Sequence, residues 1–203
     1  MFITLEGSEG AGKSTLIESL KKYFLNNNIE FIFTKEPGAT EEGAELRKLL
    51  LDKTVELDPI SETFLLLADR IEHVKKIINP ALKENKNVLS DRYLDSTYAY
   101  QGGGRKINKE ELDKLIKPLK FPVPDLTIYL DLPAEEGLMR AKGRDRLDRF
   151  EEEEIDFFER IRNSYLKLAQ EDSKRIVTID STSNEKEVFL LAKEFIEKKL
   201  NES

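Results

Sequence analysis

The chain of 203 residues has no cysteine, no tryptophan and a single histidine. Without cysteine it can form neither a disulfide framework nor a zinc site of thiolate ligands. No stretch approaches the eighteen apolar residues that a membrane-spanning helix needs, and the first residues lack the basic start and apolar core of a secretory signal. We therefore expect a cytoplasmic protein without a membrane partner.

An excess of basic residues is also missing, because 40 acidic residues outnumber 33 basic ones and give a net charge of −7. Proteins that bind nucleic acid present a basic face to its phosphates, so we expect no nucleic-acid partner. Chemistry on a phosphate would have to depend on cations gathered locally. The length suits one domain spanning residues 1–203.

Five short runs of β-branched and apolar residues alternate with longer segments of helical period. Strands separated by helices need crossover connections, and such connections produce a parallel sheet with helices on both faces. Asp58 with Pro59 has the pattern of a helix start, for a helix reaching about Asn79, and Asn184 with Glu187 resembles a capping box. The sequence thus predicts a doubly wound α/β fold with five parallel strands, over residues 2–6, 29–34, 87–91, 126–132 and 175–180.

A glycine-rich segment directly follows the first run and reads GSEGAGKS over residues 7–14. It matches the phosphate loop of P-loop NTPases, in which backbone N–H groups and a helix N-terminus surround phosphates, Lys13 reaches the β- and γ-phosphates and Ser14 ligates Mg²⁺. We predict that this loop binds ATP through Gly7, Ser8, Glu9, Gly10, Ala11, Gly12, Lys13, Ser14 and Thr15.

A phosphate loop alone does not distinguish a kinase from a motor, a transporter or a switch. A GTPase normally carries a late guanine-reading motif of Asn or Thr, Lys, any residue and Asp. The nearest match, TKEP at residues 34–37, lacks the aspartate and lies too early. A GTPase is therefore disfavoured.

Several motifs further along resemble those of the thymidylate kinase family. They are Glu-Pro-Gly at residues 36–38, Asp-Arg-Tyr at 91–93, Ser-Thr at 96–97, AYQG at 99–102 and an arginine-rich segment at 140–149. The resemblance covers the whole chain. It implies a P-loop NTPase fold with strand order 2-3-1-4-5, a homodimer, and transfer of the γ-phosphoryl group of ATP, with Mg²⁺, to dTMP, giving dTDP for dTTP synthesis.

The residue types agree with that reaction. The phosphate of a nucleoside monophosphate is mostly ionised at pH 7, since its second pKa is about 6, so no general base is required. Catalysis then depends on positioning and on charge neutralisation, for which the chain supplies many arginines. Asp91 and Arg92 should emerge at the carboxyl edge of the sheet. The resemblance implies that Arg92 bridges both phosphates and that Asp91 holds Mg²⁺ through water; Asp131 is a second candidate for the metal.

The resemblance also assigns residues to dTMP. Glu9 is expected at the sugar 3′-hydroxyl, Arg47 at the phosphate, Arg70 and Thr97 at the base, and Tyr100 near C2′. The full expected set is Glu9, Glu36, Arg47, Leu66, Arg70, Arg92, Thr97, Tyr100 and Gln101.

The arginine-rich segment surrounds a flexible glycine, Gly143, and predicts a lid over about residues 134–150. Some thymidylate kinases place an additional arginine in the phosphate loop, and this chain does not. The missing positive charge should come from the lid. We therefore expect Arg140, Arg144 and Arg149 to be catalytic, together with Lys13 and Arg92.

The helix after Pro59 has two predicted faces. The apolar stripe of Phe64, Leu67, Ile71, Val74 and Ile78 is expected in the core. Glu62, Leu66, Arg70 and His73 fall on another face, and His73 receives no role.

Two positions depart from the family pattern. Ala39 replaces a usual glycine, so a positive φ there would be strained. Leu66 replaces the aromatic residue that usually stacks on thymine, so the preference for thymine is less firmly indicated than the reaction.

Other functions stay open at this point. A kinase for another nucleoside monophosphate or for a deoxynucleoside would share these motifs, although a nucleoside acceptor would need a base. An ATP-binding regulator without turnover is disfavoured, because Lys13, Ser14, Asp91, Arg92 and the lid arginines are all retained.

Overall fold

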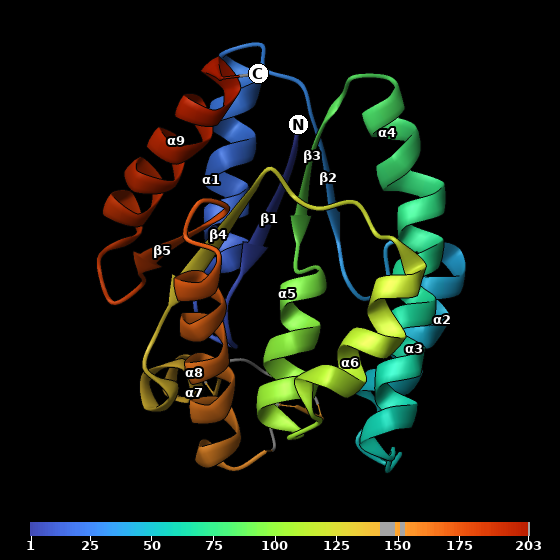
Figure 1. Cartoon of the computed structure of the whole chain (residues 1–203). Coiled ribbons are helices and arrows are strands. Elements are labelled where there is room, and N and C mark those ends of the chain that lie inside the picture. The colour runs from blue at the N-terminus through green and yellow to red at the C-terminus, as the bar shows by residue number, and fades with distance from the viewer. Residues whose placement is uncertain (143–148, 151–152, 203) are drawn as a thin grey trace.

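The structure, a computed structural model, describes residues 1–142, 149–150 and 153–202. Its centre is a parallel sheet with strand order β2-β3-β1-β4-β5 (Figure 1). The predicted α/β class, parallel sheet and strand order are confirmed, with strand ends within two residues of those expected. The strands are β1 (Phe2–Glu6), β2 (Phe31–Lys35), β3 (Asn87–Asp91), β4 (Leu126–Asp131) and β5 (Ile176–Asp180).

Helices connect successive strands, as parallel pairing requires. Short helical elements of π or 3₁₀ type, labelled η, interrupt or end some of these helices. In chain order the elements are α1 (Lys13–Asn26), α2 (Glu41–Leu51), α3 (Pro59–His73), η1 (Val74–Ile78), α4 (Asn79–Lys83), α5 (Leu94–Thr97), η2 (Tyr98–Gly104), α6 (Lys109–Ile116), η3 (Lys117–Leu119), α7 (Ala134–Lys142), α8 (Ile155–Glu171) and α9 (Glu185–Asn201).

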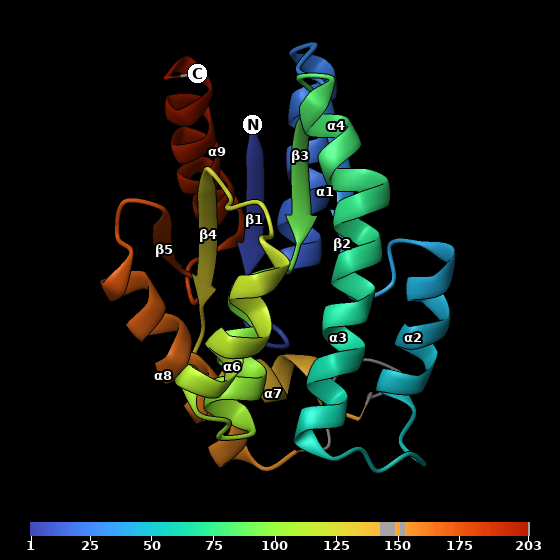
Figure 2. The same ribbon diagram turned by 45° about the vertical axis from the view of Figure 1, so that its right-hand side comes forward.

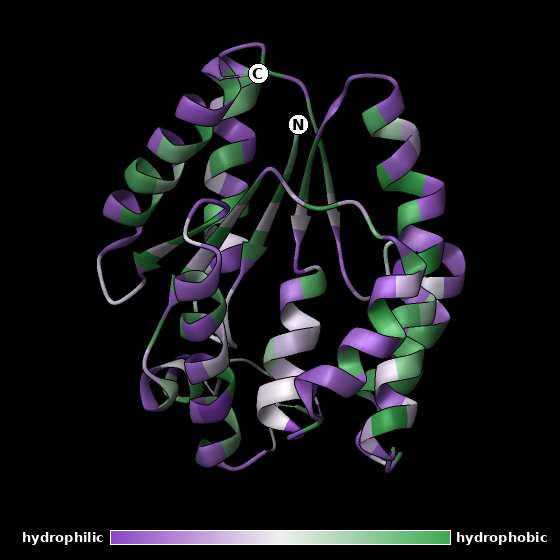
Figure 3. Cartoon of the chain, viewed as in Figure 1, coloured by the Kyte–Doolittle hydropathy of each residue, from purple (hydrophilic) through white to green (hydrophobic). Residues whose placement is uncertain are grey.

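Both faces of the sheet are covered (Figure 2). Helices α1 and α9 pack on one face, where Leu20, Phe24 and Ile196 join residues of β1 and β4 in the largest apolar cluster. The opposite face packs against η1, α4 and α8. Helices such as α3 and α9 carry both hydrophobic and hydrophilic bands (Figure 3), as expected for helices with one face against a core.

The predicted helix starts are confirmed. Asp58 accepts hydrogen bonds from the backbone N–H groups of Ile60 and Ser61, and Asn184 accepts one from that of Glu187 at 3.0 Å. Side-chain acceptors at these positions satisfy N–H groups that lack a partner within the helix. The helix that begins at Pro59 continues past Asn79, through the π turn η1 into α4.

The predicted facing of this helix is wrong in part. Leu67, Val74 and Ile78 are buried, but Phe64 is 53% exposed and Ile71 is 39% exposed. The inward face of α3 is occupied instead by buried polar residues, including Glu62, Arg70 and His73. These side chains form hydrogen bonds inside the molecule, which offset the cost of burying them and leave Phe64 and Ile71 outside.

All strands run in one direction, and their carboxyl ends point towards α5, α6, α7 and α8 (Figures 1 and 2). Both ends of the chain lie at the opposite end of the sheet. Within the described part of the chain, no helix has the length and apolar character needed to span a bilayer. The carboxyl edge is where open α/β sheets bind ligands.

Candidate active site

The phosphate loop connects β1 to α1, as predicted. Lys13 is nearly buried, and its Nζ donates to the carbonyl oxygens of Gly7 (2.8 Å) and Ser8 (3.1 Å). Burial, and secondly the charge of Arg92, lowers the pKa of Lys13 to about 8. The ammonium group is therefore held by the loop's own carbonyls.

Glycine is required where the loop meets α7. Gly10 has φ +76°, and a Cβ there would lie 2.3 Å from the carbonyl oxygen of Gly137. A Cβ on Gly137 would in turn lie 2.7 Å from the carbonyl oxygen of Glu9. The helix that leads into the arginine-rich segment is thereby in direct backbone contact with the phosphate loop.

A pocket opens at the carboxyl edge beside this loop. It gathers all nine residues that the sequence assigned to the acceptor, although they come from elements spread along the chain. Its lining consists of Glu9, Gly10, Lys13, Ser14, Glu36, Pro37, Arg47, Leu51, Leu66, Arg70, Asp91, Arg92, Ser96, Thr97, Tyr100, Gln101 and Phe150.

Arg92 lines this pocket and has a left-handed backbone conformation, with φ +67°. Its Nη2 is 2.9 Å from Oε1 of Glu9, and its guanidinium lies over the ring of Tyr100. The Tyr100 hydroxyl hydrogen-bonds both carboxylate oxygens of Glu9, at 2.8 and 2.7 Å. These three predicted residues form one hydrogen-bonded unit within the pocket, which joins the phosphate loop to Arg92 and η2.

The metal candidates are distinguished by their hydrogen bonds. Oδ1 of Asp91 is buried and has no hydrogen-bond partner among the described residues. Asp131 is paired with Arg162 through both oxygens, at 2.8 and 2.9 Å. Because a buried polar atom normally has a partner, Asp91 fits a missing ligand better than Asp131 does.

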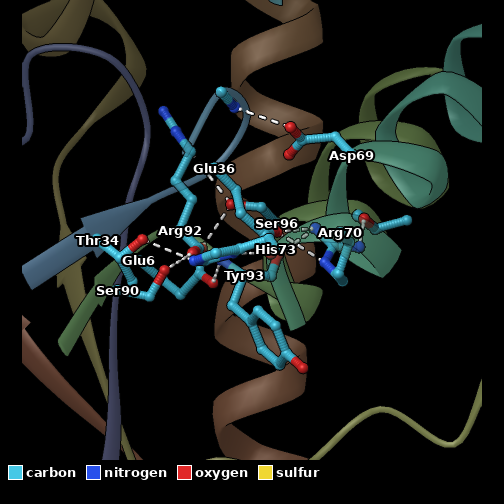
Figure 4. A network of polar contacts seen from close by, with 12 residues as sticks. Glu6, Thr34, Glu36, Asp69, Arg70, His73, Ser90, Arg92, Tyr93 and Ser96 are labelled. Carbon is cyan, nitrogen blue, oxygen red and sulfur yellow. Dashed lines mark hydrogen bonds and ion pairs between the residues drawn. The ribbon is translucent and has the colours of Figure 1, made fainter. Parts of the chain in front are cut away.

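Arg70 points its guanidinium between two motifs predicted to contact dTMP (Figure 4). Its Nε donates to Oε2 of Glu36 at 2.7 Å, Nη1 to Oγ1 of Thr97 at 2.7 Å, and Nη2 to the carbonyl of Tyr93 at 2.9 Å. Leu66, one helical turn earlier on α3, lines the same pocket. The guanidinium is thus fixed in direction before any ligand binds.

His73, which the sequence left without a role, belongs to the same network (Figure 4). Its Nδ1 lies 2.7 Å from Oε1 of Glu36, and its Nε2 lies 2.7 Å from Oγ1 of Thr34. Both oxygens of Glu36 are therefore engaged by α3, so Glu36 acts on the pocket through Arg70. The three-residue spacing between Arg70 and His73 was the only hint of this in the sequence.

Comparison with known proteins agrees with this geometry. A family profile described as thymidylate kinase matches residues 5–190. The thymidylate kinase of Carboxydothermus hydrogenoformans is 44% identical over 197 residues, covering 97% of this chain and 96% of that protein. The chain belongs to the thymidylate kinase family.

Further thymidylate kinases support the assignment. That of Pseudomonas fluorescens is 47% identical over 183 residues, covering 89% of this chain and 87% of that protein. The crystal structure of the enzyme from Ehrlichia chaffeensis superposes with a TM-score of 0.78 at 31% identity, covering 97% and 98% of the two chains. The predicted dTMP kinase reaction is thereby confirmed.

A second pocket of this thymidylate kinase also borders the phosphate loop, through Gly10, Ala11 and Gly12. It includes Thr15 and the segment 181–185 that follows β5, and Arg140 contributes to its lining. Arg140 donates to the carbonyl of Ser181 at 3.1 Å and pairs with Glu136 at 2.6 Å. Arg140 is thus next to the loop but is not among the residues that line the pocket of Arg92.

The other lid arginines have different positions. Arg144 lies outside the described residues. Arg149 donates from Nη2 to Oε2 of the buried Glu62 at 2.6 Å and from Nε to the carbonyl of Leu50 at 3.0 Å. Its neighbour Phe150 lines the acceptor pocket. In this structure Arg149 therefore fixes the end of the segment and does not point at the phosphate loop.

The two departures from the thymidylate kinase pattern have clear outcomes. Ala39 is not among the residues with positive φ, whereas Gly38 has φ +103°, so the strain considered for Ala39 is absent. Leu66 lines the pocket, and Phe64 does not. No aromatic side chain of α3 replaces the missing one.

The sequence reasoning overlooked Glu6, the last residue of β1. Its carboxylate is fully buried and accepts hydrogen bonds from the backbone N–H of Tyr93 (2.8 Å) and the hydroxyls of Ser96 (2.6 Å) and Tyr165 (2.8 Å). Burial, and then the charge of Asp95, raises the pKa of Glu6 to about 7. An acidic residue at the end of an apolar strand, next to the phosphate loop, was the available signal. Phe150 and Leu51 also line the pocket, and no signal in the sequence marked them.

Proposed function

We propose that phosphoryl transfer occurs between the phosphate loop and the pocket at the carboxyl edge, with ATP on the loop and dTMP in the pocket. The observation that carries this assignment is that Lys13 and Arg92 line the same pocket as Arg70 and Leu66. The pocket therefore combines cations that could bind the phosphates of ATP and dTMP with side chains that could contact the base of dTMP.

Arg92 is the group best placed to act on both substrates. Its partner Glu9 is a carboxylate that would repel an incoming phosphate, so we expect phosphate oxygens to replace it on the guanidinium. Glu9 then remains available for the sugar 3′-hydroxyl. The acceptor oxygen is already ionised, so the described residues need only position it and neutralise charge.

Asp91 and Ser14 would hold Mg²⁺, which supplies positive charge beside the transferring phosphoryl group. Oδ1 of Asp91 is buried without a partner among the described residues, and Ser14 lines the same pocket. No cluster of three or more acidic or histidine ligands occurs in the described part of the chain. That suits Mg²⁺, which usually keeps several waters and takes few protein ligands.

We further propose a single kinase domain over residues 1–203 with a lid at about 134–150. The contact between Gly137 and the phosphate loop supports this, because it holds α7, which carries Arg140, against the loop proposed to bind ATP. Arg140 and Arg144 would complete the charge on closure. We expect Arg144→Ala to lower kcat more than it raises the Kd of ATP. A higher Kd of ATP with an unchanged kcat would contradict the lid role.

The central test is a coupled assay with ATP and Mg²⁺ against dTMP, other nucleoside monophosphates and unphosphorylated nucleosides. Lys13→Ala and Arg92→Ala should each reduce turnover with dTMP about a hundredfold or more. The control is Lys21→Ala, which removes an exposed lysine of α1 that pairs with Glu18. Near-normal turnover of folded Arg92→Ala would remove Arg92 from the mechanism.

We propose that two copies associate through the outer face of α3. Ile60, Phe64 and Ile71 are 38, 53 and 39% exposed and are four and seven residues apart, so they share one face. An exposed apolar face of this kind typically marks a contact surface. We expect sedimentation to show a dimer for the wild-type chain and a monomer for Phe64→Glu. Leu25→Glu, at an exposed position on α1, should remain dimeric. A wild-type monomer would refute the proposal.

Because it consumes ATP and dTMP, we propose that the enzyme works in the cytoplasm. Fractionation of cells that express a tagged chain would test the location.

A further inference from the structure

Glu6 carries a carboxylate that is buried inside the molecule. It is the last residue of β1 and immediately precedes the phosphate loop at Gly7. The carboxylate has no ion-pair partner among the described residues; all three of its hydrogen-bond donors are uncharged. Burial makes the charged form of this carboxylate costly, and only uncharged groups donate to it, while the charge of Arg92 acts on it without a direct ion pair.

Two of the donors flank Arg92. The backbone N–H of Tyr93 belongs to the peptide that follows Arg92, and it is held by Oε1 of Glu6 at 2.8 Å. The Ser96 hydroxyl donates to Oε2 of Glu6 and lies 3.4 Å from Nη1 of Arg92. Figure 4 shows these residues as one connected set.

The backbone of Arg92 needs such support. Its φ of +67° is unfavourable for a residue with a side chain and persists only where the surroundings enforce it. Ser90 donates to the Arg92 carbonyl at 2.8 Å, and the Arg92 N–H donates to the carbonyl of Leu5 at 2.9 Å. Glu6 completes the set by fixing the peptide after Arg92 and the hydroxyl beside its guanidinium.

We propose that Glu6 is a positioning residue for phosphoryl transfer, because it aligns the Arg92 guanidinium with the phosphate loop that begins at the next residue. The inference rests on the proposed role of Arg92 at the phosphates. Glu6 links the two parts of the site directly: β1 leads into the loop that holds ATP, and the Glu6 side chain holds the segment that carries Arg92.

Two substitutions test separately whether the length or the charge of the Glu6 side chain matters. Glu6→Asp keeps the charge but shortens the side chain by one methylene, so it cannot reach both Tyr93 N–H and Ser96. Glu6→Gln keeps the length; its oxygen can accept from Tyr93 N–H while its amide donates to the hydroxyls of Ser96 and Tyr165. We expect Glu6→Asp to lower kcat about tenfold or more, with the Kd of ATP changed less than about twofold. Glu6→Gln should stay within about threefold of wild-type kcat.

Thr4→Val is the matched control for a purely structural role. Thr4 is also fully buried, lies two residues earlier on the same face of β1, and its hydroxyl bonds to that of Thr127 at 2.7 Å. This variant should be less stable but retain wild-type kcat per folded molecule. Wild-type kcat in folded Glu6→Asp, or a loss in Glu6→Gln as large as in Glu6→Asp, would overturn the proposal.

Folding and the role of Arg92 are controlled separately. If Glu6→Asp does not fold, Ser96→Ala carries the test, because it removes the hydroxyl between Glu6 and Arg92; unchanged kcat would then overturn the proposal. Arg92→Ala is assayed in parallel. If Arg92→Ala is active, the proposed role of Arg92 fails; if it is inactive while the Glu6 variants are normal, only the role of Glu6 fails.

Discussion

Nε of Arg70 lies 2.7 Å from Oε2 of Glu36, and both side chains are 3% exposed. Breaking a buried ion pair by removing one partner leaves an unpaired charge in a medium that solvates it poorly. We expect Glu36→Gln to lower the free energy of unfolding by about 3–5 kcal/mol, measured by urea titration at fixed protein concentration.

The control for that prediction is Glu45→Gln, which removes an exposed partner of Lys48 on α2. Its effect should stay below about 1 kcal/mol, because solvent screens an exposed pair. If Glu36→Gln and Glu45→Gln lowered the free energy of unfolding equally, the buried Arg70–Glu36 pair would stabilise the fold no more than an exposed pair does.

A second expectation concerns the base. Leu66 lines the pocket where the family usually has an aromatic ring, and it shares a face of α3 with Arg70. Leu66→Phe should leave kcat nearly unchanged and tighten dTMP several-fold, since an aromatic contact adds roughly 0.5–1.5 kcal/mol. Titration with dTMP measures this, with Phe64→Leu as a control outside the pocket. Unchanged affinity in Leu66→Phe would mean that thymine does not lie against this residue.

The buried hydroxyl of Tyr93 provides a stability test. It has no hydrogen-bond partner among the described residues, whereas the equally buried hydroxyl of Tyr165 donates to Glu6. Tyr93→Phe should therefore be neutral or stabilising by up to about 1 kcal/mol, and Tyr165→Phe should lose about 1–3 kcal/mol. Thermal melts compare the two. A larger loss in Tyr93→Phe would indicate that its hydroxyl has a partner, such as a water molecule.

The titration of Glu6 predicts how stability depends on pH. Its pKa rises from about 4.5 to about 7 on folding, so between these values the folded state binds the extra proton. The contribution of Glu6 to the free energy of unfolding is fully present below pH 4.5 and is lost as the pH rises through 7. The loss is at most about 1.4 kcal/mol per pH unit.

Glu6→Gln removes that titration. The difference in melting temperature between the wild type and Glu6→Gln should therefore grow in favour of the variant from pH 5 to pH 8. Other carboxyl groups are common to both proteins and cancel in the difference. A constant difference across this range would show that Glu6 does not titrate there.

The sequence by itself determined the fold class, the phosphate loop and the reaction. The fold class and the loop follow from local information, namely alternating strand and helix patterns and a glycine-rich motif after the first strand. The reaction follows from the resemblance of short motifs, such as Asp91 and Arg92 after β3, to those of thymidylate kinases. Parallel pairing then leaves one edge of the sheet for the chemistry, so convergence of the motifs was predictable.

Tertiary packing decided which face of α3 points inward and which polar groups are partners. Hydrophobic periodicity placed Phe64 in the core, but pairing of Arg70 with Glu36 and of Arg149 with Glu62 drew the polar face inside. Glu6 and His73 gained their roles in the same way. Such roles depend on contacts between segments far apart in the chain, and the cost of burying a charge is known only when its partners are in place.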